Sequence, residues 1–223
     1  MQRRAFLAYL AALVGAVTNR PLSHKVIPAG PGYLQLHAGS PPSGAVDERV
    51  LWDMTRELGR FGGVPGGPKE VVAWGKALGR TVLLAARPPQ PGENWLSWST
   101  GLFEADGAGG VGSCGGPGMP LRPLEASGSH NLWVGGQYWG QVGGVVTKRA
   151  ARVRVLFDMG IPPLDLVPVE VGERFPVNFY AGFYQQPRKD ERPCTWQVVR
   201  VVAVDKRGRK VAERKIGGTR PER

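Results

Sequence analysis

Apolar and polar residues alternate with a period of two over much of the chain from residue 70 onward. Residues 70–76 and 80–87 flank an Ala-Leu-Gly turn, so together they predict a β-hairpin. In residues 151–157, apolar side chains alternate with Arg152 and Arg154, which is typical of a strand with one buried face. Similar segments bounded by turn residues predict further strands over residues 95–103, 131–142, 166–171, 175–184, 196–204 and 209–215.

The last two of these strands form the clearest predicted hairpin, because Asp205-Lys206-Arg207-Gly208 between them is a favourable turn sequence. One segment instead has helical spacing. Over residues 47–61, apolar residues recur every three or four positions, with Asp47 placed as the N-cap and Gly62 as the stop signal. We therefore expect one short helix that packs on a sheet.

The fold class predicted from this pattern is mainly β: an antiparallel sandwich or barrel-like fold of one or two small subdomains. The 33 glycines and 20 prolines in 223 residues agree with many turns. The expected organisation is a signal peptide over 1–16, a linker or irregular segment over 17–46, a first β subdomain with the helix over 47–128, a second β subdomain over 129–216 and a basic tail over 217–223.

The N-terminus has the pattern of a signal peptide. Two arginines precede an uncharged apolar run over residues 5–17, and Ala16 suits a cleavage site. The run is shorter than the roughly 20 residues of a spanning helix, so no stable membrane span is expected. Arg3-Arg4-Ala5-Phe6-Leu7 also resembles a twin-arginine export signal. We therefore expect an extracytoplasmic protein, either secreted or held in the cell envelope. The alternative is that this N-terminal segment is the first helix of a cytoplasmic protein.

The two cysteines, Cys114 and Cys194, lack the CxxC spacing of zinc or redox motifs. In an oxidising compartment we expect them to form a disulfide. The alternative is two separate buried thiols.

The glycine-rich segment over residues 106–120 predicts a flexible loop. Gly107, Gly109 and Gly112 have the GxGxxG spacing of dinucleotide-binding loops. However, the Ser-Cys-Gly-Gly-Pro that follows cannot open the helix on which such a site depends, so no dinucleotide site is expected.

No catalytic constellation is evident. The three histidines, His24, His37 and His130, lie in separate segments, and no serine has the GxSxG spacing of a nucleophile elbow. We therefore expect neither an enzyme nor a cofactor. The seven tryptophans are expected mainly in the core, with sugar stacking by an exposed one as the alternative; they are Trp52, Trp74, Trp95, Trp98, Trp133, Trp139 and Trp196.

Positive charge is concentrated near the C-terminus. The whole chain has a net charge of +11, and residues 188–223 contain 12 Lys or Arg against 5 Asp or Glu. These cations predict a polyanion-binding edge; the alternative is a solvated sheet edge whose charges block strand pairing. The candidate polyanion-binding residues are Arg200, Lys206, Arg207, Arg209, Lys210, Arg214 and Lys215.

The segments WGQV, ARVRVLFDMG, FPVNFYAGFY and WQVVRVVAVDKRGRKVAE follow one another between Tyr138 and Glu213. In this order they resemble the C-terminal β module of uncharacterised exported proteins of high-GC bacteria. In that module a strand ending in Asp-Gly comes first and a hairpin of the form VRAYDAxGRVVAE comes last. Residues 71–114 are more distantly similar to the partner half. The resemblance implies a structural β module and carries no catalytic residues.

We therefore expect a secreted or envelope-associated β-sandwich module that binds or scaffolds, with an anionic cell-wall polymer or another envelope protein as partner. The first alternative is an extracytoplasmic hydrolase whose residues converge only in the fold. The second is a cytoplasmic nucleic-acid-binding protein that uses the basic C-terminal region. The lack of RNA-binding motifs with aromatic platforms disfavours nucleic acid.

Overall fold

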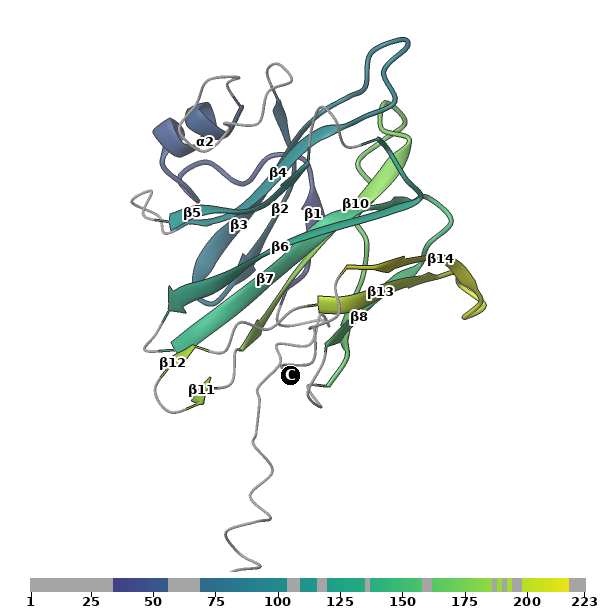
Figure 1. Cartoon of the computed structure of the whole chain (residues 1–223). Helices are drawn as coiled ribbons and strands as arrows, with labels where there is room; N and C mark the ends of the chain where they lie inside the picture. The colour runs from purple at the N-terminus through teal and green to yellow at the C-terminus, as the bar shows by residue number, and fades with distance from the viewer. Residues whose placement is uncertain are drawn as a thin grey trace, which may run out of the picture.

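Three antiparallel sheets and one short helix make up the part of the chain that the computed structural model describes (Figure 1). The mainly β prediction is confirmed, and these sheets stack without closing into a barrel, consistent with a β-sandwich. The described residues are 34–55, 69–103, 109–115, 120–134, 137–157, 162–185, 188–189, 192–193 and 198–216.

The first sheet has five strands. Its predicted hairpin is confirmed, because Leu78 and Gly79 have φ values of 56° and 74° and so form the type of turn that matches the twist of the strands. The strands are, in spatial order, β1 (His37–Ala38), β2 (Glu70–Ala77), β3 (Arg80–Arg87), β4 (Ser97–Phe103) and β5 (Gly109–Gly115).

The second sheet lies in the middle, and the third packs on its far side. The middle sheet has the spatial order β10 (Val177–Gln185), β7 (Gln137–Thr147) and β6 (Leu124–Val134). The third sheet has the order β14 (Lys210–Lys215), β13 (Val198–Val204), β8 (Arg152–Phe157) and β9 (Leu164–Leu166). A further short pair joins β11 (Arg188–Lys189) to β12 (Arg192–Pro193).

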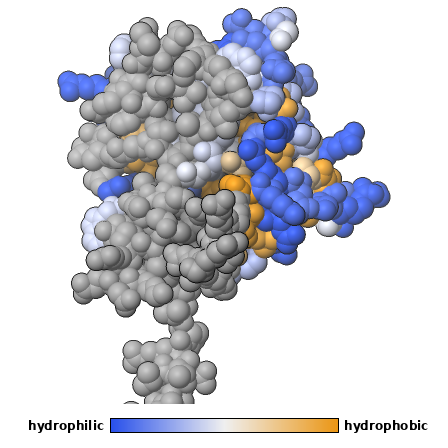
Figure 2. Space-filling view, viewed as in Figure 1, coloured by the Kyte–Doolittle hydropathy of each residue, from blue (hydrophilic) through white to orange (hydrophobic). Residues whose placement is uncertain are grey.

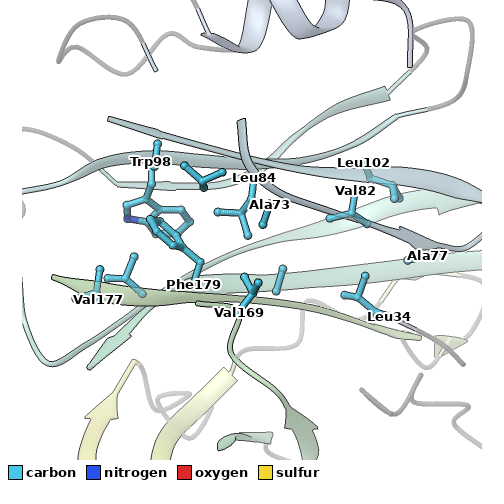
Figure 3. Packing of buried hydrophobic residues seen from close by; sticks show 14 of the residues in the cluster. Leu34, Ala73, Ala77, Val82, Leu84, Trp98, Leu102, Val169, Val177 and Phe179 are labelled. Carbon is cyan, nitrogen blue, oxygen red and sulfur yellow. The ribbon is translucent and has the colours of Figure 1, made fainter. Parts of the chain in front are cut away.

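Two apolar cores separate the three sheets. Between the first and middle sheets, Trp98 and Leu84 point toward Phe179 and Val169 (Figure 3). Between the middle and third sheets, the second core includes Val142, Tyr184 and Val201. Because the middle sheet is buried on both faces, β10 is apolar at nearly every position, as strands with two buried faces are.

The predicted helix is confirmed over α2 (Glu48–Thr55), and residues 56–61 of the prediction lie outside the described residues. Asp47 is its N-cap, since the Asp47 carboxylate accepts a 2.7 Å hydrogen bond from the backbone N–H of Arg49. The helix packs Val50 on Leu83 and Phe103, on the face of the first sheet that points away from the middle sheet. The described part of the chain is therefore built in four layers.

Three predictions of secondary structure are wrong: one in the type of element and two in the bounds of a strand. The glycine-rich segment predicted as a loop contains β5, which pairs with β4; seven residues with almost no side-chain pattern gave no strand signal. The single strand predicted over 131–142 is parts of two strands, because Val134 pairs with Gln137. The strand predicted over 166–171 begins earlier, as β9, and is followed by an isolated bridge between Val169 and Phe179.

The expected boundary between residues 128 and 129 falls inside β6. The core between the first and middle sheets takes residues from both sides of that boundary, including Val72 and Phe183. The predicted signal peptide and basic tail lie outside the described residues. Within the described part, no helix is long and apolar enough to cross a membrane.

Candidate functional site: a basic tip on the third sheet

The predicted polyanion-binding residues all lie on the β13–β14 hairpin. Figure 2 shows hydrophilic side chains projecting at the right of the view, where Figure 1 places this hairpin. Arg200 and Lys215 are exposed, paired in register on neighbouring strands. The turn and its end supply four further exposed cations, namely Lys206, Arg207, Arg209 and Lys210.

Asp205 shapes the turn that carries these cations. Its carboxylate accepts hydrogen bonds from the backbone N–H groups of Arg207 (2.8 Å) and Arg209 (2.9 Å), and from Nε of Arg209 (2.9 Å). These bonds, first of all the one from the Arg209 backbone, hold the pKa of Asp205 below its usual value. Gly208 has a φ of 77°, which completes the reversal. The cations therefore project from an ordered turn.

A second turn, between β7 and β8, lies beside the first. The backbone N–H of Ala151 donates a 2.8 Å hydrogen bond to the carbonyl of Val204, and Arg152 pairs in register with Val204. The exposed side chains of Arg149 and Arg152 are thereby brought next to the hairpin turn. We call the combined surface the basic tip; it consists of Arg149, Arg152, Lys206, Arg207, Arg209 and Lys210.

Most of the charge at the basic tip is not neutralised. Arg209 pairs with Asp205 at 2.8 Å, and Lys210 pairs with Glu213 at 2.7 Å. The other four cations form no ion pair within the described part of the chain; they are Arg149, Arg152, Lys206 and Arg207. This excess of exposed positive charge can bind anions without first breaking ion pairs within the described part of the chain.

The remainder of the outward face is closer to neutral. Arg154 donates two hydrogen bonds, of 2.8 and 2.9 Å, to the carboxylate of Asp165. Arg200 lies 3.3 Å from Glu213. The Arg154 bonds also lower the pKa of Asp165, so this pair remains ionised at neutral pH. Most of the described cations on this face that form no ion pair therefore lie at the basic tip.

Sequence reasoning missed Arg149 and Arg152, and three of its candidates, Arg200, Arg214 and Lys215, lie on the hairpin but outside the basic tip. Arg214 is directed toward β6, where it forms an ion pair with Glu125. The alternation in residues 151–157 did place Arg152 on an exposed strand face. However, nothing in the sequence showed that this strand pairs with β13.

The other candidate residues that the structure describes are not brought together. Cys114 lies on β5, but Cys194 is outside the described residues, so the disulfide stays a prediction. His37 lies on β1 with its ring 4.9 Å from that of Trp74, His130 lies on β6, and His24 is outside the described residues. Among described residues, no group of three or more His, Cys, Asp or Glu side chains could hold a metal ion.

The tryptophans divide between core and surface. Trp98 and Trp139 are buried, whereas Trp52 and Trp133 are 55% and 51% exposed. Trp95 is half-buried beneath the guanidinium of Arg87, which lies 4.6 Å from the ring centre. The expected core position is therefore confirmed for Trp98 and Trp139 and not for Trp52 and Trp133. Trp196 lies outside the described residues.

Comparison with known proteins gave no assignment: no family model, no curated protein and no solved structure matches this chain.

Proposed function

We propose that this protein is a non-catalytic binding module of the cell envelope that holds an anionic polymer on its basic tip. The observation that carries the proposal is the meeting of two turns, at residues 147–152 and 204–210, which brings four unpaired cations to the same end of the third sheet. These turns are about fifty residues apart in the chain. If these cations served only to keep a sheet edge solvated, the charged residues of two distant turns would not need to lie at the same end of the sheet.

A polymer suits this surface better than a small anion does. The cations are exposed and carried by separate strands and turns, so they present several weak contacts and no enclosed site. Contacts of this kind gain affinity from repeated charges on one ligand and from the release of counterions. The signal-like N-terminus supports an envelope location, which makes an anionic wall polymer the partner we propose.

The experiment compares binding of the full chain to polyphosphate with binding of a double variant, Arg152→Gln with Arg207→Gln. This variant removes one unpaired cation from each turn. The matched control, Arg49→Gln with Lys76→Gln, removes two exposed cations from α2 and β2. We expect about a tenfold or greater loss of affinity for the tip variant and little change for the control.

Equal losses in the two double variants would show that net charge alone governs binding, which contradicts the proposal. Polyglutamate and duplex DNA are assayed in parallel. Tighter binding to DNA than to both other polymers would favour the nucleic-acid alternative and overturn the envelope assignment.

A further inference from the structure

A groove of about 250 Å³ opens on the inner side of the same hairpin, between β14 and the residues that lead into β6. Its position follows from the topology. On one side, the middle and third sheets are joined by the Val169–Phe179 bridge and the packing of β9 on β10. On the other side, β14 and β6 are edge strands that form no hydrogen-bonded ladder with each other. The groove occupies this open side of the sandwich.

Two arginines converge on one carboxylate beside the groove. Arg214, from β14, forms an ion pair with Glu125 of β6, whose side chain is only 10% exposed. The second cation is Arg122, whose Nε lies 3.5 Å from the other Glu125 oxygen. Glu213 also lines the groove, but Lys210 and Arg200 already pair with it. The cluster therefore contains one positive charge more than its carboxylate neutralises.

We propose that this groove binds a small monocarboxylate with an apolar substituent. Arg122 and Arg214 both line it, and they already hold the planar carboxylate of Glu125, the group that arginine recognises best. Leu124, Val211 and Ala212 provide an apolar wall for the substituent. This proposal is independent of the polyanion site, because none of the six residues of the basic tip lines the groove.

Charge and exposure also favour a ligand at this place. The Arg122 side chain is 61% exposed, so it can turn toward a bound anion without unfolding its surroundings. Burial, and then the neighbouring charge of Arg122, lowers the pKa of Arg214. A monoanion in the groove would offset the neighbouring positive charge of Arg122, whereas a polymer with many charges would exceed the single uncompensated charge.

The alternative is that the cluster only protects this edge of the sandwich from pairing with other chains, which we call the guard role. Inward-pointing charges on edge strands prevent pairing with other chains, and Arg214 has that position. A cluster with only the guard role needs no ligand and gives no saturable binding. Saturable binding of a carboxylate therefore distinguishes the proposed site from the guard role.

The test uses hexanoate as the probe, with the full chain and calorimetry or ligand-observed NMR. We expect saturable binding of hexanoate and none of hexan-1-ol. In Arg122→Gln, affinity falls by about tenfold or more, because a charged hydrogen-bond donor is lost. In Val211→Phe, which fills the apolar wall and keeps every charge, affinity falls to a similar extent.

The tip variant, Arg152→Gln with Arg207→Gln, is the control: it keeps hexanoate binding whether or not it loses polyphosphate, so the two proposals can fail separately. Absence of saturable hexanoate binding to the unmodified chain would overturn the proposal and leave the guard role as the explanation of the cluster. Wild-type affinity in both Arg122→Gln and Val211→Phe would also overturn it.

Discussion

The hydroxyl of Tyr180 donates a 2.7 Å hydrogen bond to the main-chain carbonyl of Glu125. Tyr180 lies on β10 and Glu125 on β6, so the side chain crosses the whole width of β7. It passes over Gly144, with which Tyr180 is paired in register. Burial raises the pKa of Tyr180, so the hydroxyl remains a donor. The bond fixes the backbone of the residue that anchors the Arg122 and Arg214 cluster.

Gly144 should be required for this arrangement. A Cβ at this position would collide with the Glu125 carbonyl and would lie 2.8 Å from the Tyr180 hydroxyl. We expect Gly144→Ala to lower the free energy of unfolding by about 3 kcal/mol, because the obstructing group is backbone and cannot move aside. Urea unfolding of the variant and the unmodified chain measures this difference.

The control for that prediction is Tyr180→Phe, which removes the hydrogen bond without adding an atom. Its expected cost is smaller, about 1–2 kcal/mol, since one buried carbonyl loses its partner. Combining Tyr180→Phe with Gly144→Ala should not restore stability, because the Glu125 carbonyl still obstructs the new Cβ. Restoration in the double variant would show that the hydroxyl, and not the backbone, requires glycine.

Asp205→Asn should change how stability depends on pH. Because the pKa of Asp205 is lowered in the folded chain, its charge stabilises the fold fully above the unfolded pKa of about 3.9 and progressively less as pH falls through the folded value. We expect the variant to be less stable at neutral pH, the difference to shrink as pH falls below about 4, and the difference to vanish only below the lowered folded pKa of Asp205. Unfolding midpoints in urea across this range provide the measurement; a difference that persists at low pH would contradict it.

Export predicts a change in mass. Protein recovered from its native host should lack residues 1–16, if cleavage follows Ala16, and should gain two hydrogen atoms on reduction if Cys114 and Cys194 are joined. Intact mass spectrometry with and without reduction tests both. An uncut chain with free thiols would contradict the envelope location and favour a cytoplasmic role.

Local patterns predicted the parts of the fold that depend on local chemistry. The β2–β3 and β13–β14 hairpins were found because turn residues separate alternating strands. The exposed face of β8 was found because Arg152 and Arg154 alternate with apolar residues that the structure buries. In each case, the residues that form the sequence pattern are the same residues that form the hairpin or the strand face.

Features that depend on distant pairing could not be found in this way. Gly140 and Gly144 weaken a strand by local preference, yet they allow Tyr184 and Tyr180 to lie across β7. The stretch over 109–115 has no side-chain alternation and is a strand because β4 pairs with it. The basic tip required β8 to pair with β13, a contact between residues that are far apart in the chain.

The most direct test of the polyanion proposal is the salt dependence of polyphosphate binding by the unmodified chain and by Arg152→Gln with Arg207→Gln. If the basic tip holds the polymer, the logarithm of affinity falls with the logarithm of salt concentration, and the slope of the variant is shallower by about two. The Arg49→Gln with Lys76→Gln control should retain the original slope. Equal slopes in all three proteins, or binding by the unmodified chain that is insensitive to salt, would contradict polymer binding at the basic tip.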